Sequence, residues 1–261
     1  MKERLDIILV NKGIVDSRSK AQDLIKNGKI YVNGNKITKS SYSCKLEDNI
    51  EVHGELLKYV SRGGLKLEGA LKAFNFDLTA KKVIDIGSST GGFTDCCIQN
   101  GASKVIAVDV GTNQMHSSLL NNPKLELHEN TDIRNLNVEV VKDVEVAVID
   151  TSFISVTKFV PIITKYPKLE SIICLIKPQF ECGKEIADKY KGMILDKKVH
   201  LDVIKNVTTT FKENVFYLNG LAPSSIRGGD GNIEYVALFE KKYNHVNINF
   251  EEVINFAFKN K

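Results

Sequence analysis

The sequence predicts an α/β domain built on a doubly wound, mostly parallel sheet, preceded by a small α+β domain. In the larger part of the chain, six apolar runs of strand length alternate with segments of helical periodicity. Apolar strands that alternate with helices are typical of a parallel sheet covered on both faces. The runs comprise residues 83–86, 105–108, 144–149, 172–176, 215–218 and 235–239.

The first part of the chain has the pattern of a smaller, separate domain. Apolar residues recur at helical spacing over residues 3–12 and 17–27, which predicts two short helices. Strand-like runs follow around the Asn33-Gly34 turn, a typical hairpin signal. Two helices followed by short strands indicate an α+β domain.

The two parts also differ in charge. We expect the small domain over residues 1–57, a linker over 58–61 and the α/β domain over 62–261. Residues 1–45 hold ten Lys and Arg against four Asp and Glu, a net charge of +6, whereas the whole chain carries only +4. A basic domain of this kind suits a polyanion such as a nucleic acid. An ordinary solvated domain would account for the charge equally well.

Composition argues against several other classes of protein. The chain is 43% hydrophobic and 26% charged, as soluble globular proteins are. No apolar run approaches the roughly 20 residues of a membrane helix, and the N-terminus lacks the pattern of a secretion signal. The five cysteines form no paired framework and the five histidines show no metal-ligand spacing. We therefore predict a cytoplasmic protein with reduced thiols and no metal.

A glycine-rich turn joins the first predicted strand of the α/β domain to a helix. Turns at the carboxyl ends of parallel strands are where nucleotide-like cofactors bind. Gly87 and Gly92 fit the dinucleotide fingerprint G-x-G-x-x-G, but Ser89 takes the place of its middle glycine. No Gly-Lys-Ser or Gly-Lys-Thr closes the turn, which excludes a P-loop.

Carboxylates at neighbouring strand ends point to S-adenosylmethionine, which carries a cationic sulfonium and no phosphate. Asp109 ends the strand after the glycine-rich turn, 24 residues beyond Asp85, where it can accept hydrogen bonds from ribose hydroxyls. Asp132 follows the third strand and can receive the adenine amino group. We therefore favour a methyltransferase over a dehydrogenase. The expected cofactor-binding residues are Asp85, Gly87, Ser89, Gly91, Gly92, Phe93, Asp109 and Asp132.

Four charged residues form a candidate catalytic group. Asp150 and Lys177 end two strands at the same edge as the glycine-rich turn, whereas Lys66 begins a helix. Glu234 opens the last strand, which must run antiparallel to bring it to that edge. A ribose 2′-hydroxyl is a weak acid, so its methylation requires proton removal, alkoxide stabilisation and alignment. Lys177 is our candidate for binding the hydroxyl, stabilising its anion and accepting its proton. Asp150 would position Lys177, and Lys66 and Glu234 would orient the ribose.

The small domain carries a spaced set of motifs, namely Arg4-Leu5-Asp6, Ser17-Arg18, Gly28-Lys29-Ile30, Val32-Asn33-Gly34 and Asp48-Asn49-Ile50. Their spacing resembles that of the S4 domain of ribosomal proteins, pseudouridine synthases and some tRNA synthetases. The resemblance implies contacts to the phosphates of structured RNA, which position a protein rather than read sequence. The RNA-binding residues that we expect along the chain are Arg4, Arg18, Lys20, Lys29, Arg62 and Arg227.

The four charged residues match the Lys-Asp-Lys-Glu tetrad of FtsJ-like ribose 2′-O-methyltransferases, with Gly91-Gly92-Phe93 where that family often has Gly-Gly-Trp. Residues 60–64, 108–114, 150–155 and 176–181, behind an S4-like domain, resemble the TlyA family. This resemblance implies a Rossmann-like class I methyltransferase with a seven-stranded sheet. It also implies S-adenosylmethionine as cofactor and methylation of a cytidine ribose in ribosomal RNA.

The resemblance bears on partners as well. Some members of the TlyA family are labelled haemolysins. Only three residues precede Arg4, and this short N-terminus favours the compact form of the family, which acts on large-subunit RNA. We expect a monomer that binds the ribosomal subunit or its RNA and no membrane.

Two other classes stay open. One is a non-enzymatic RNA-binding protein with a degenerate cofactor fold, against which the intact tetrad argues. The other is a membrane-lytic protein, against which the lack of apolar spans argues. Two loops are also open to interpretation: the loop around Gly192 could cover the site and residues 225–232 could contact RNA, or both could be plain connections.

Overall fold

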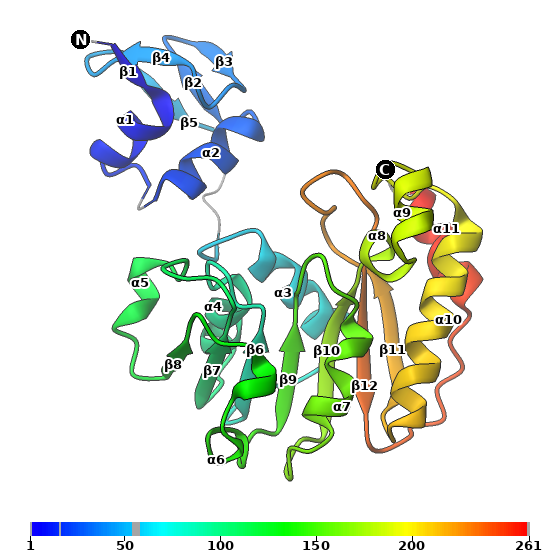
Figure 1. Ribbon diagram of the computed structural model, residues 1–261. Coiled ribbons are helices and arrows are strands. Elements are labelled where there is room, and N and C mark those ends of the chain that lie inside the picture. The colour runs from blue at the N-terminus through cyan, green and yellow to red at the C-terminus, as the bar shows by residue number, and fades with distance from the viewer. Residues whose placement is uncertain (1, 16, 54–57, 260–261) are drawn as a thin grey trace. The chain divides into compact units, whose positions relative to one another are not determined.

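The computed structural model describes residues 2–15, 17–53 and 58–259 (Figure 1). The chain separates into two compact units, Met1–Arg62 and Gly63–Lys261, and each has its own hydrophobic core. Residues 54–57, where we expect the small domain to end, lie outside the described residues.

The first unit packs two helices against short strands. Its elements are β1 (Lys2–Arg4), α1 (Leu5–Asn11), α2 (Arg18–Lys26), β2 (Ile30–Val32), β3 (Asn35–Ile37), β4 (Ser43–Lys45) and β5 (Ile50–Val52). β2 pairs with β3 and β5, and β1 pairs with β4, all antiparallel. Leu5, Ile8 and Leu9 of α1 are buried against Leu24 and Ile25 of α2. The apolar spacing that predicts the two helices therefore also builds the core.

The start of the chain differs from the prediction, which begins the first helix at residue 3. Lys2–Arg4 is an exposed strand paired with β4, and α1 begins only at Leu5. The partner strand is distant in sequence, so this pairing leaves no local signal. Long-range pairing has overridden the local helical pattern here.

The second unit contains a seven-stranded sheet in the order β11-β12-β10-β9-β6-β7-β8. Its strands are β6 (Lys82–Ile86), β7 (Lys104–Val108), β8 (Leu125–His128), β9 (Val146–Ile149), β10 (Ser171–Ile176), β11 (Tyr217–Pro223) and β12 (Tyr235–Glu240). Strands β8, β7, β6, β9 and β10 run parallel, whereas β12 is antiparallel to both of its neighbours. The predicted fold class and the antiparallel last strand are confirmed.

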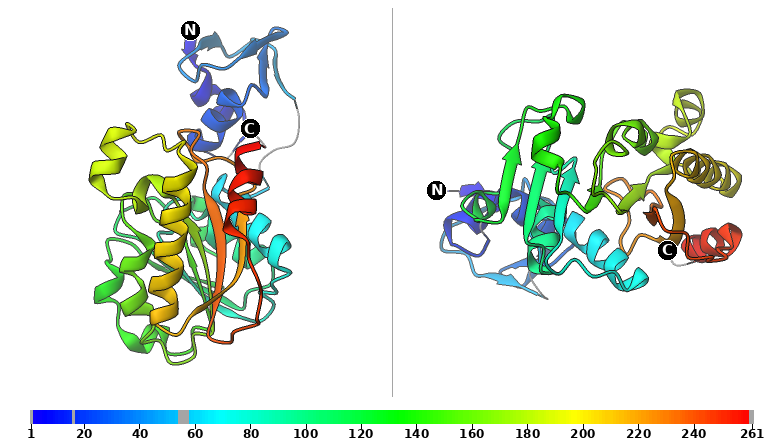
Figure 2. Two further views of the ribbon diagram at one scale, coloured as in Figure 1. Left: turned by 90° about the vertical axis from the view of Figure 1, so that its right-hand side faces the viewer. Right: turned by 90° about the horizontal axis from the view of Figure 1, so that it is seen from below.

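Helices cover both faces of this sheet. α3 and α4 lie on one face, and α7 and α10 lie on the other (Figure 2). α11 packs against α10 and β11. The helices are α3 (Gly63–Phe74), α4 (Gly92–Gln99), α5 (Ser117–Leu120), α6 (Val138–Val141), α7 (Val160–Ile163), α8 (Pro178–Glu181), α9 (Lys184–Lys189), α10 (Lys197–Glu213) and α11 (Phe250–Lys259), with 3-10 turns η1 (Ile133–Asn135) and η2 (Val156–Lys158).

β11 begins later and ends later than the predicted strand at residues 215–218. Val215 has a φ of 61° and belongs to the turn after α10. The strand then contains a bulge between Leu218 and Gly220, and a Cβ on Gly220 would lie 2.6 Å from the ring of Phe74. This bulge depends on how the end of α3 packs against the strand, which an apolar run cannot show.

Every residue of β9 and β10 is buried, and apart from Ser171 at the start of β10 both strands are apolar. No helix within the described residues combines the length and the apolar character needed to cross a membrane. No three His, Cys, Asp or Glu of the described chain gather as a metal site. The parallel strands place the carboxyl ends of β6, β7, β9 and β10 at one edge, where ligands bind in such sheets.

Candidate active site

The turn after β6 has a backbone that favours glycine at two positions. Gly87 and Gly91 have φ angles of 83° and 89°, which side chains disfavour. A Cβ on Gly87 would lie 2.8 Å from Cγ2 of Thr151 and 3.0 Å from the carbonyl oxygen of Asp150. The turn therefore packs directly against the end of β9, which brings the glycine-rich loop beside Asp150.

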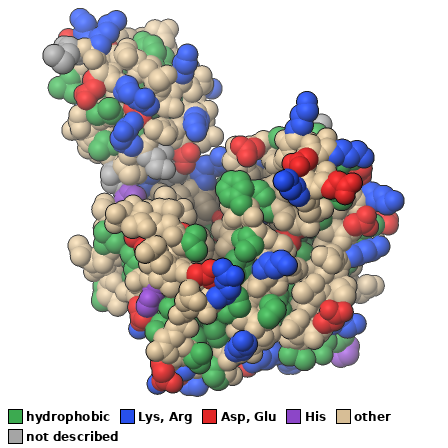
Figure 3. Space-filling model, viewed as in Figure 1, with side chains coloured by type: hydrophobic (Ala, Val, Ile, Leu, Met, Phe, Trp, Pro, Cys, Tyr) green, Lys and Arg blue, Asp and Glu red, His purple; other side chains and the backbone are tan. Residues whose placement is uncertain are grey.

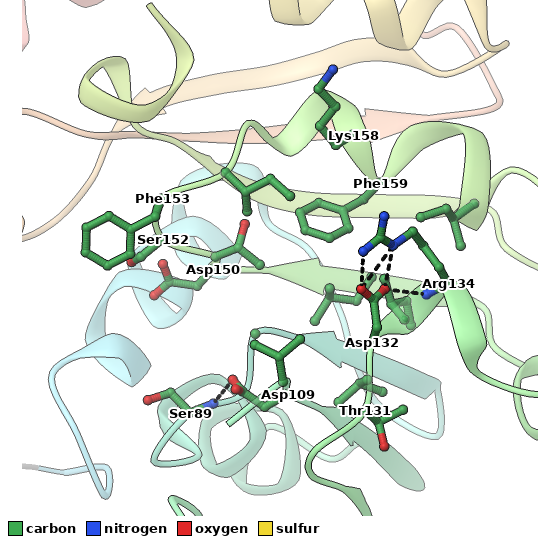
Figure 4. Close-up of a pocket in the computed structure, with 18 of the residues that line it drawn as sticks. Ser89, Asp109, Thr131, Asp132, Arg134, Asp150, Ser152, Phe153, Lys158 and Phe159 are labelled. Carbon is green, nitrogen blue, oxygen red and sulfur yellow. Dashed lines mark hydrogen bonds and ion pairs between the residues drawn. The ribbon is translucent and has the colours of Figure 1, made fainter. Parts of the chain in front are cut away.

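Asp109, just after β7, fixes the same turn from the other side. Its Oδ2 accepts a hydrogen bond from the backbone N–H of Ser89 at 2.8 Å (Figure 4), and its Oδ1 accepts one from Gly111 at 2.7 Å. A carboxylate oxygen can accept more than one hydrogen bond. Asp109 can therefore shape the turn and still bind the hydroxyls of a ligand.

A cavity of about 830 Å³ lies at this edge of the sheet. Asp109, Asp132 and Asp150 face into it from the segments that follow β7, β8 and β9 (Figure 4). Hydrogen bonds from Arg134 lower the pKa of Asp132 to about 2, so this carboxylate is charged at neutral pH. Lys158 borders the cavity but extends away from it (Figure 4). Two of these carboxylates are ion-paired, Asp132 with Arg134 and Asp150 with Lys177, whereas Asp109 is bound by backbone N–H groups. The charge of Asp109 therefore contributes most to attracting a cationic ligand.

The four predicted catalytic residues form two ion pairs. Lys177 Nζ lies 2.6 Å from Asp150 Oδ1 and donates a hydrogen bond to Ser152 Oγ at 3.2 Å. Lys66 Nζ donates to Glu234 Oε2 at 2.6 Å. Lys66, Lys177 and Glu234 are all buried, and buried charges are stable only when paired. The fold thus brings both lysines and both carboxylates together from four different elements.

Local structure explains how these residues reach the site. Pro178 directly follows Lys177 and occupies the first turn of α8, where its missing N–H costs nothing. On the other side, Ser225 Oγ donates to the carbonyl of Leu65 at 2.8 Å. A Cβ on Gly228 would lie 2.5 Å from Glu234 Oε1. The loop of residues 225–232 therefore packs on both ends of the Lys66–Glu234 pair and is more than a plain connection.

The loop around Gly192 is hydrogen-bonded to the loop of residues 225–232. Asn232 Oδ1 accepts a hydrogen bond from the N–H of Ile194 at 3.1 Å, and its Nδ2 donates to the carbonyl of Gly192 at 2.8 Å. Arg227, which we expect to bind RNA, donates to the carbonyl of Ala257 in α11 at 3.3 Å. Arg227 thus has a structural partner that its sequence position does not reveal.

Four of the expected cofactor residues are not among those that line the cavity: Asp85, Gly91, Gly92 and Phe93. Asp85 is fully buried and accepts a hydrogen bond from Thr94 Oγ1 at 2.6 Å. Burial, with a smaller contribution from nearby Asp150, raises the pKa of Asp85 to about 7. Gly87, Ser89, Asp109 and Asp132 do line the cavity. Asp85, which we expect to contact the cofactor, is thus buried in the interior and is not among the residues that line this cavity.

Both units of the chain match known protein families. Residues 59–241 match the FtsJ-like methyltransferase family and residues 3–50 match the S4 domain. Hemolysin A of Brachyspira hyodysenteriae is 42% identical over 90% of this chain and 99% of its own length. The 23S rRNA (cytidine-2′-O)-methyltransferase TlyA of Campylobacter jejuni is 37% identical over 89% of this chain and 97% of its own length.

The chain belongs to the TlyA family. Its resemblance to FtsJ-like enzymes and to S4 domains is thereby confirmed. A solved structure from Streptococcus thermophilus, named "putative hemolysin", superposes with a TM-score of 0.78 at 36% identity, over 99% of this chain and 96% of that one. The fold is shared with a structure from Listeria monocytogenes named as a putative S-adenosylmethionine-dependent methyltransferase, at a TM-score of 0.53 and 15% identity. The Asp109 carboxylate in the cavity suits the positive charge and the hydroxyls of such a cofactor.

In the S4 domain of this TlyA-family protein, one buried carboxylate organises two of the predicted RNA-binding arginines. Asp6 is unexposed and accepts hydrogen bonds from Arg4 Nε at 2.9 Å and from Arg18 Nη2 at 3.0 Å. The Arg4 guanidinium holds the pKa of Asp6 well below its usual range. Both arginine side chains stay about half exposed, and basic groups outnumber acidic ones on the face of this domain seen in Figure 3. Lys20 and Lys29 lie in the same domain and are partly exposed.

The sequence gives no sign of one residue at the rim of the cavity. Phe153 is 90% exposed and has a φ of 66°, an unusual backbone for an aromatic residue. Its loop is held by Glu181, whose Oε1 accepts from the N–H of Val156 at 2.8 Å and whose Oε2 accepts from Ser155 Oγ at 2.5 Å. An exposed ring beside Asp150 is suited to stacking on a nucleobase. Only the folded structure shows this ring to be exposed.

The Asp109 contacts predict a loss of cofactor binding in Asp109→Asn. An amide in place of the carboxylate turns a donor toward one of the two backbone N–H groups and removes the charge. We expect the dissociation constant of S-adenosylmethionine, measured by calorimetry, to rise about tenfold or more. Asp202→Asn, an exposed change on α10, should leave it unchanged. Equal affinities for the wild type and Asp109→Asn would contradict this assignment.

The raised pKa of Asp85 predicts a pH-dependent stability. The folded pKa of about 7 lies above the ordinary value of 3.8, so between these values the folded state keeps a proton that the unfolded state has lost. The free energy of unfolding should therefore fall as pH rises toward 7, by up to about 1.4 kcal/mol per pH unit. In urea unfolding from pH 5 to pH 8, the free energy of unfolding of Asp85→Asn should rise relative to that of the wild type as pH increases. A constant difference between the free energies of unfolding of the two proteins across this pH range would refute the prediction.

Proposed function

We propose that this protein transfers the methyl group of S-adenosylmethionine to the 2′-hydroxyl of a cytidine in ribosomal RNA. The observation that carries the proposal is the pair of buried ion pairs, with Asp150 shared between the tetrad and the cavity. Lysines paired to carboxylates suit an oxygen nucleophile that must lose a proton. The choice of cytidine and of ribosomal RNA rests on the name of the Campylobacter jejuni relative, a 23S rRNA (cytidine-2′-O)-methyltransferase.

The residues of the cavity would divide the work between binding and chemistry. When bound, S-adenosylmethionine supplies an activated methyl group. Asp109 would hold its ribose hydroxyls, and Asp132 would lie near its adenine. Asp150 would border the positive sulfonium, which places the transferable methyl beside Lys177.

The lysine-centred step begins from the 2′-hydroxyl held at Lys177. The hydroxyl oxygen gives an electron pair to the methyl carbon, and the carbon–sulfur pair stays with the sulfur. Lys177 Nζ would first lose the proton of its ammonium form to solvent. As a neutral amine it would then accept the hydroxyl proton, and Asp150 at 2.6 Å would stabilise the ammonium that forms again. Lys66 and Glu234, themselves fixed by their mutual hydrogen bond, would orient the ribose.

The S4 domain would bring the RNA. Arg4 and Arg18, arranged around Asp6, present two guanidinium groups that can bind phosphates. We infer that Lys20, Lys29 and Arg62 add to this positive surface. We further propose that the protein acts as a monomer in the cytoplasm and that RNA of the large ribosomal subunit is its substrate, as the Campylobacter jejuni relative's name states for that protein.

A transfer assay tests this function. The full chain is incubated with tritiated S-adenosylmethionine and with naked ribosomal RNA or each isolated subunit, and the labelled position is mapped by its alkali-resistant linkage. We expect label in large-subunit RNA. Lys177→Ala should lower the rate at least about a hundredfold while cofactor affinity stays close to that of the wild type.

Lys205→Ala, an exposed change on α10, is the matched control and should keep full activity. Absence of transfer to every RNA by protein that still binds S-adenosylmethionine would overturn the enzyme function. Loss of cofactor binding in Lys177→Ala would instead show that this lysine belongs to the cofactor site.

The S4 assignment predicts a change in the salt dependence of RNA binding. Arg18→Ala removes one phosphate contact, and Arg4 still pairs with Asp6, so the domain should stay folded. Anisotropy titrations over a range of KCl should show weaker binding, with the slope of log affinity against log salt reduced by about one. Lys72→Ala on α3 should leave that slope unaltered, and an unaltered slope in Arg18→Ala would count against the assignment.

A further inference from the structure

Ser152 joins the wall of the cavity to the lysine of the proposed reaction. It lies in the loop after β9, is exposed, and lines the cavity (Figure 4). Its Oγ accepts a hydrogen bond from Lys177 Nζ at 3.2 Å. Lys177 is buried and is not among the residues that line the cavity. The amine therefore meets the cavity at two lining residues, Ser152 and Asp150.

These two contacts of the amine differ in kind. Asp150 Oδ1 lies 2.6 Å from Lys177 Nζ, yet this buried oxygen forms no hydrogen bond with any described residue. The attraction within an ion pair depends on distance, whereas a hydrogen bond also requires the N–H to point at its acceptor. Among the described residues, Ser152 is the one acceptor toward which Lys177 directs an N–H. Asp150 thus supplies charge, and Ser152 supplies direction.

The direction of the amine matters because Lys177 must act as a base. A neutral amine carries two hydrogens and one lone pair, and the lone pair must point at the hydroxyl whose proton it accepts. Rotation about the Cε–Nζ bond moves all three together. An acceptor that holds one N–H restricts this rotation, and the negative charge of Asp150 favours the second hydrogen over the lone pair at its side. One position then remains for the lone pair.

The Ser152 hydroxyl is itself held in place by its loop. The first turn after Lys177 contacts this loop twice more, through α8. The ring centroids of Phe180 and Phe153 are 5.0 Å apart, and Glu181 Oε1 accepts a hydrogen bond from the backbone N–H of Val156 at 2.8 Å. These contacts fix the loop relative to α8 on the far side of Ser152. The hydroxyl is therefore preorganised beside the amine.

We propose that Ser152 is a positioning residue that directs the lone pair of Lys177 toward the 2′-hydroxyl of the target ribose. This inference rests on the proposed function, because Lys177 needs a directed lone pair only if it removes a proton from an oxygen nucleophile. Ser152 acts through Lys177 and takes no proton from the substrate. Its loss should therefore slow methyl transfer and leave the binding of cofactor and RNA unchanged.

Single-turnover kinetics of the full chain test this role. The substrate is the RNA identified in the transfer assay, with both RNA and S-adenosylmethionine saturating. We expect Ser152→Ala to lower the rate about tenfold, while the dissociation constants of cofactor and RNA change at most about twofold. Ser152→Thr keeps a hydroxyl at this position and should return the rate to within about threefold of the wild type.

Ser103→Ala is the matched control. Ser103 is also exposed and its Oγ makes one hydrogen bond, to the carbonyl of Lys81 at 3.0 Å, but it precedes β7 at the sheet edge opposite the cavity. This variant should keep the wild-type rate. Each variant is first checked for a wild-type thermal transition. If Ser152→Ala fails that check, Ser152→Cys takes its place, because a thiol has a similar shape but is a weak acceptor.

An unchanged rate in the variant that lacks the hydroxyl would overturn the inference, as would a folded Ser152→Thr that is as slow as Ser152→Ala. A weaker cofactor affinity with an unchanged rate at saturation would assign Ser152 to the cofactor site and also overturn it. In all of these outcomes the wild type still methylates the RNA. A wild type that transfers no methyl group to any RNA would instead refute the proposed function itself.

Discussion

Two buried lysine–carboxylate ion pairs are the constraint on which the active site depends. Lys66 and Glu234 are 2.6 Å apart, as are Lys177 and Asp150, and little of either pair is exposed. Removing one partner of such a pair typically costs about 3–5 kcal/mol, because the other charge stays buried. Each residue therefore depends on an element that is far away in the sequence. The sheet order, the antiparallel β12 and the start of α3 must all be correct for the four charges to meet.

The cavity and the S4 domain share one structural feature. In both places a carboxylate is bound by the protein itself and thereby holds a functional group in position. Asp109 binds the backbone of the glycine-rich loop, and Asp6 binds Arg4 and Arg18. Such preorganisation lowers the entropy that the ligand must otherwise lose on binding. The carboxylates of the cavity attract a cation, and the arginines of the S4 domain attract phosphate.

Much of this arrangement could be predicted from the sequence because buried parallel strands appear in it as continuous apolar runs. Asp109, Asp150 and Lys177 each follow an apolar run, and the carboxyl ends of parallel strands share an edge. Features that depend on distant contacts could not be predicted. The β1–β4 pairing and the bulge in β11 leave no local pattern.

The sequence also could not predict which individual polar and aromatic side chains are buried. Asp85 lies within the apolar run of β6, whereas Asp150 follows the run of β9, and only the structure shows that Asp85 is fully buried. Arg227, which we expect to bind RNA, also donates a hydrogen bond to the carbonyl of Ala257 in α11, a contact that the sequence does not show. Phe153 has a hydrophobic side chain of the kind usually found in a core, but it is exposed at the rim of the site. Only the tertiary structure decides which of two equally plausible surroundings such a residue has.

The identity of the methylated atom tests the central claim most directly. Ribosomal RNA treated with the protein and S-adenosylmethionine is digested to nucleosides, and the products are separated and weighed by mass spectrometry. A tetrad that delivers a ribose oxygen to the cofactor predicts 2′-O-methylcytidine, with the added mass on the sugar fragment. A methyl group on the base fragment would contradict the account.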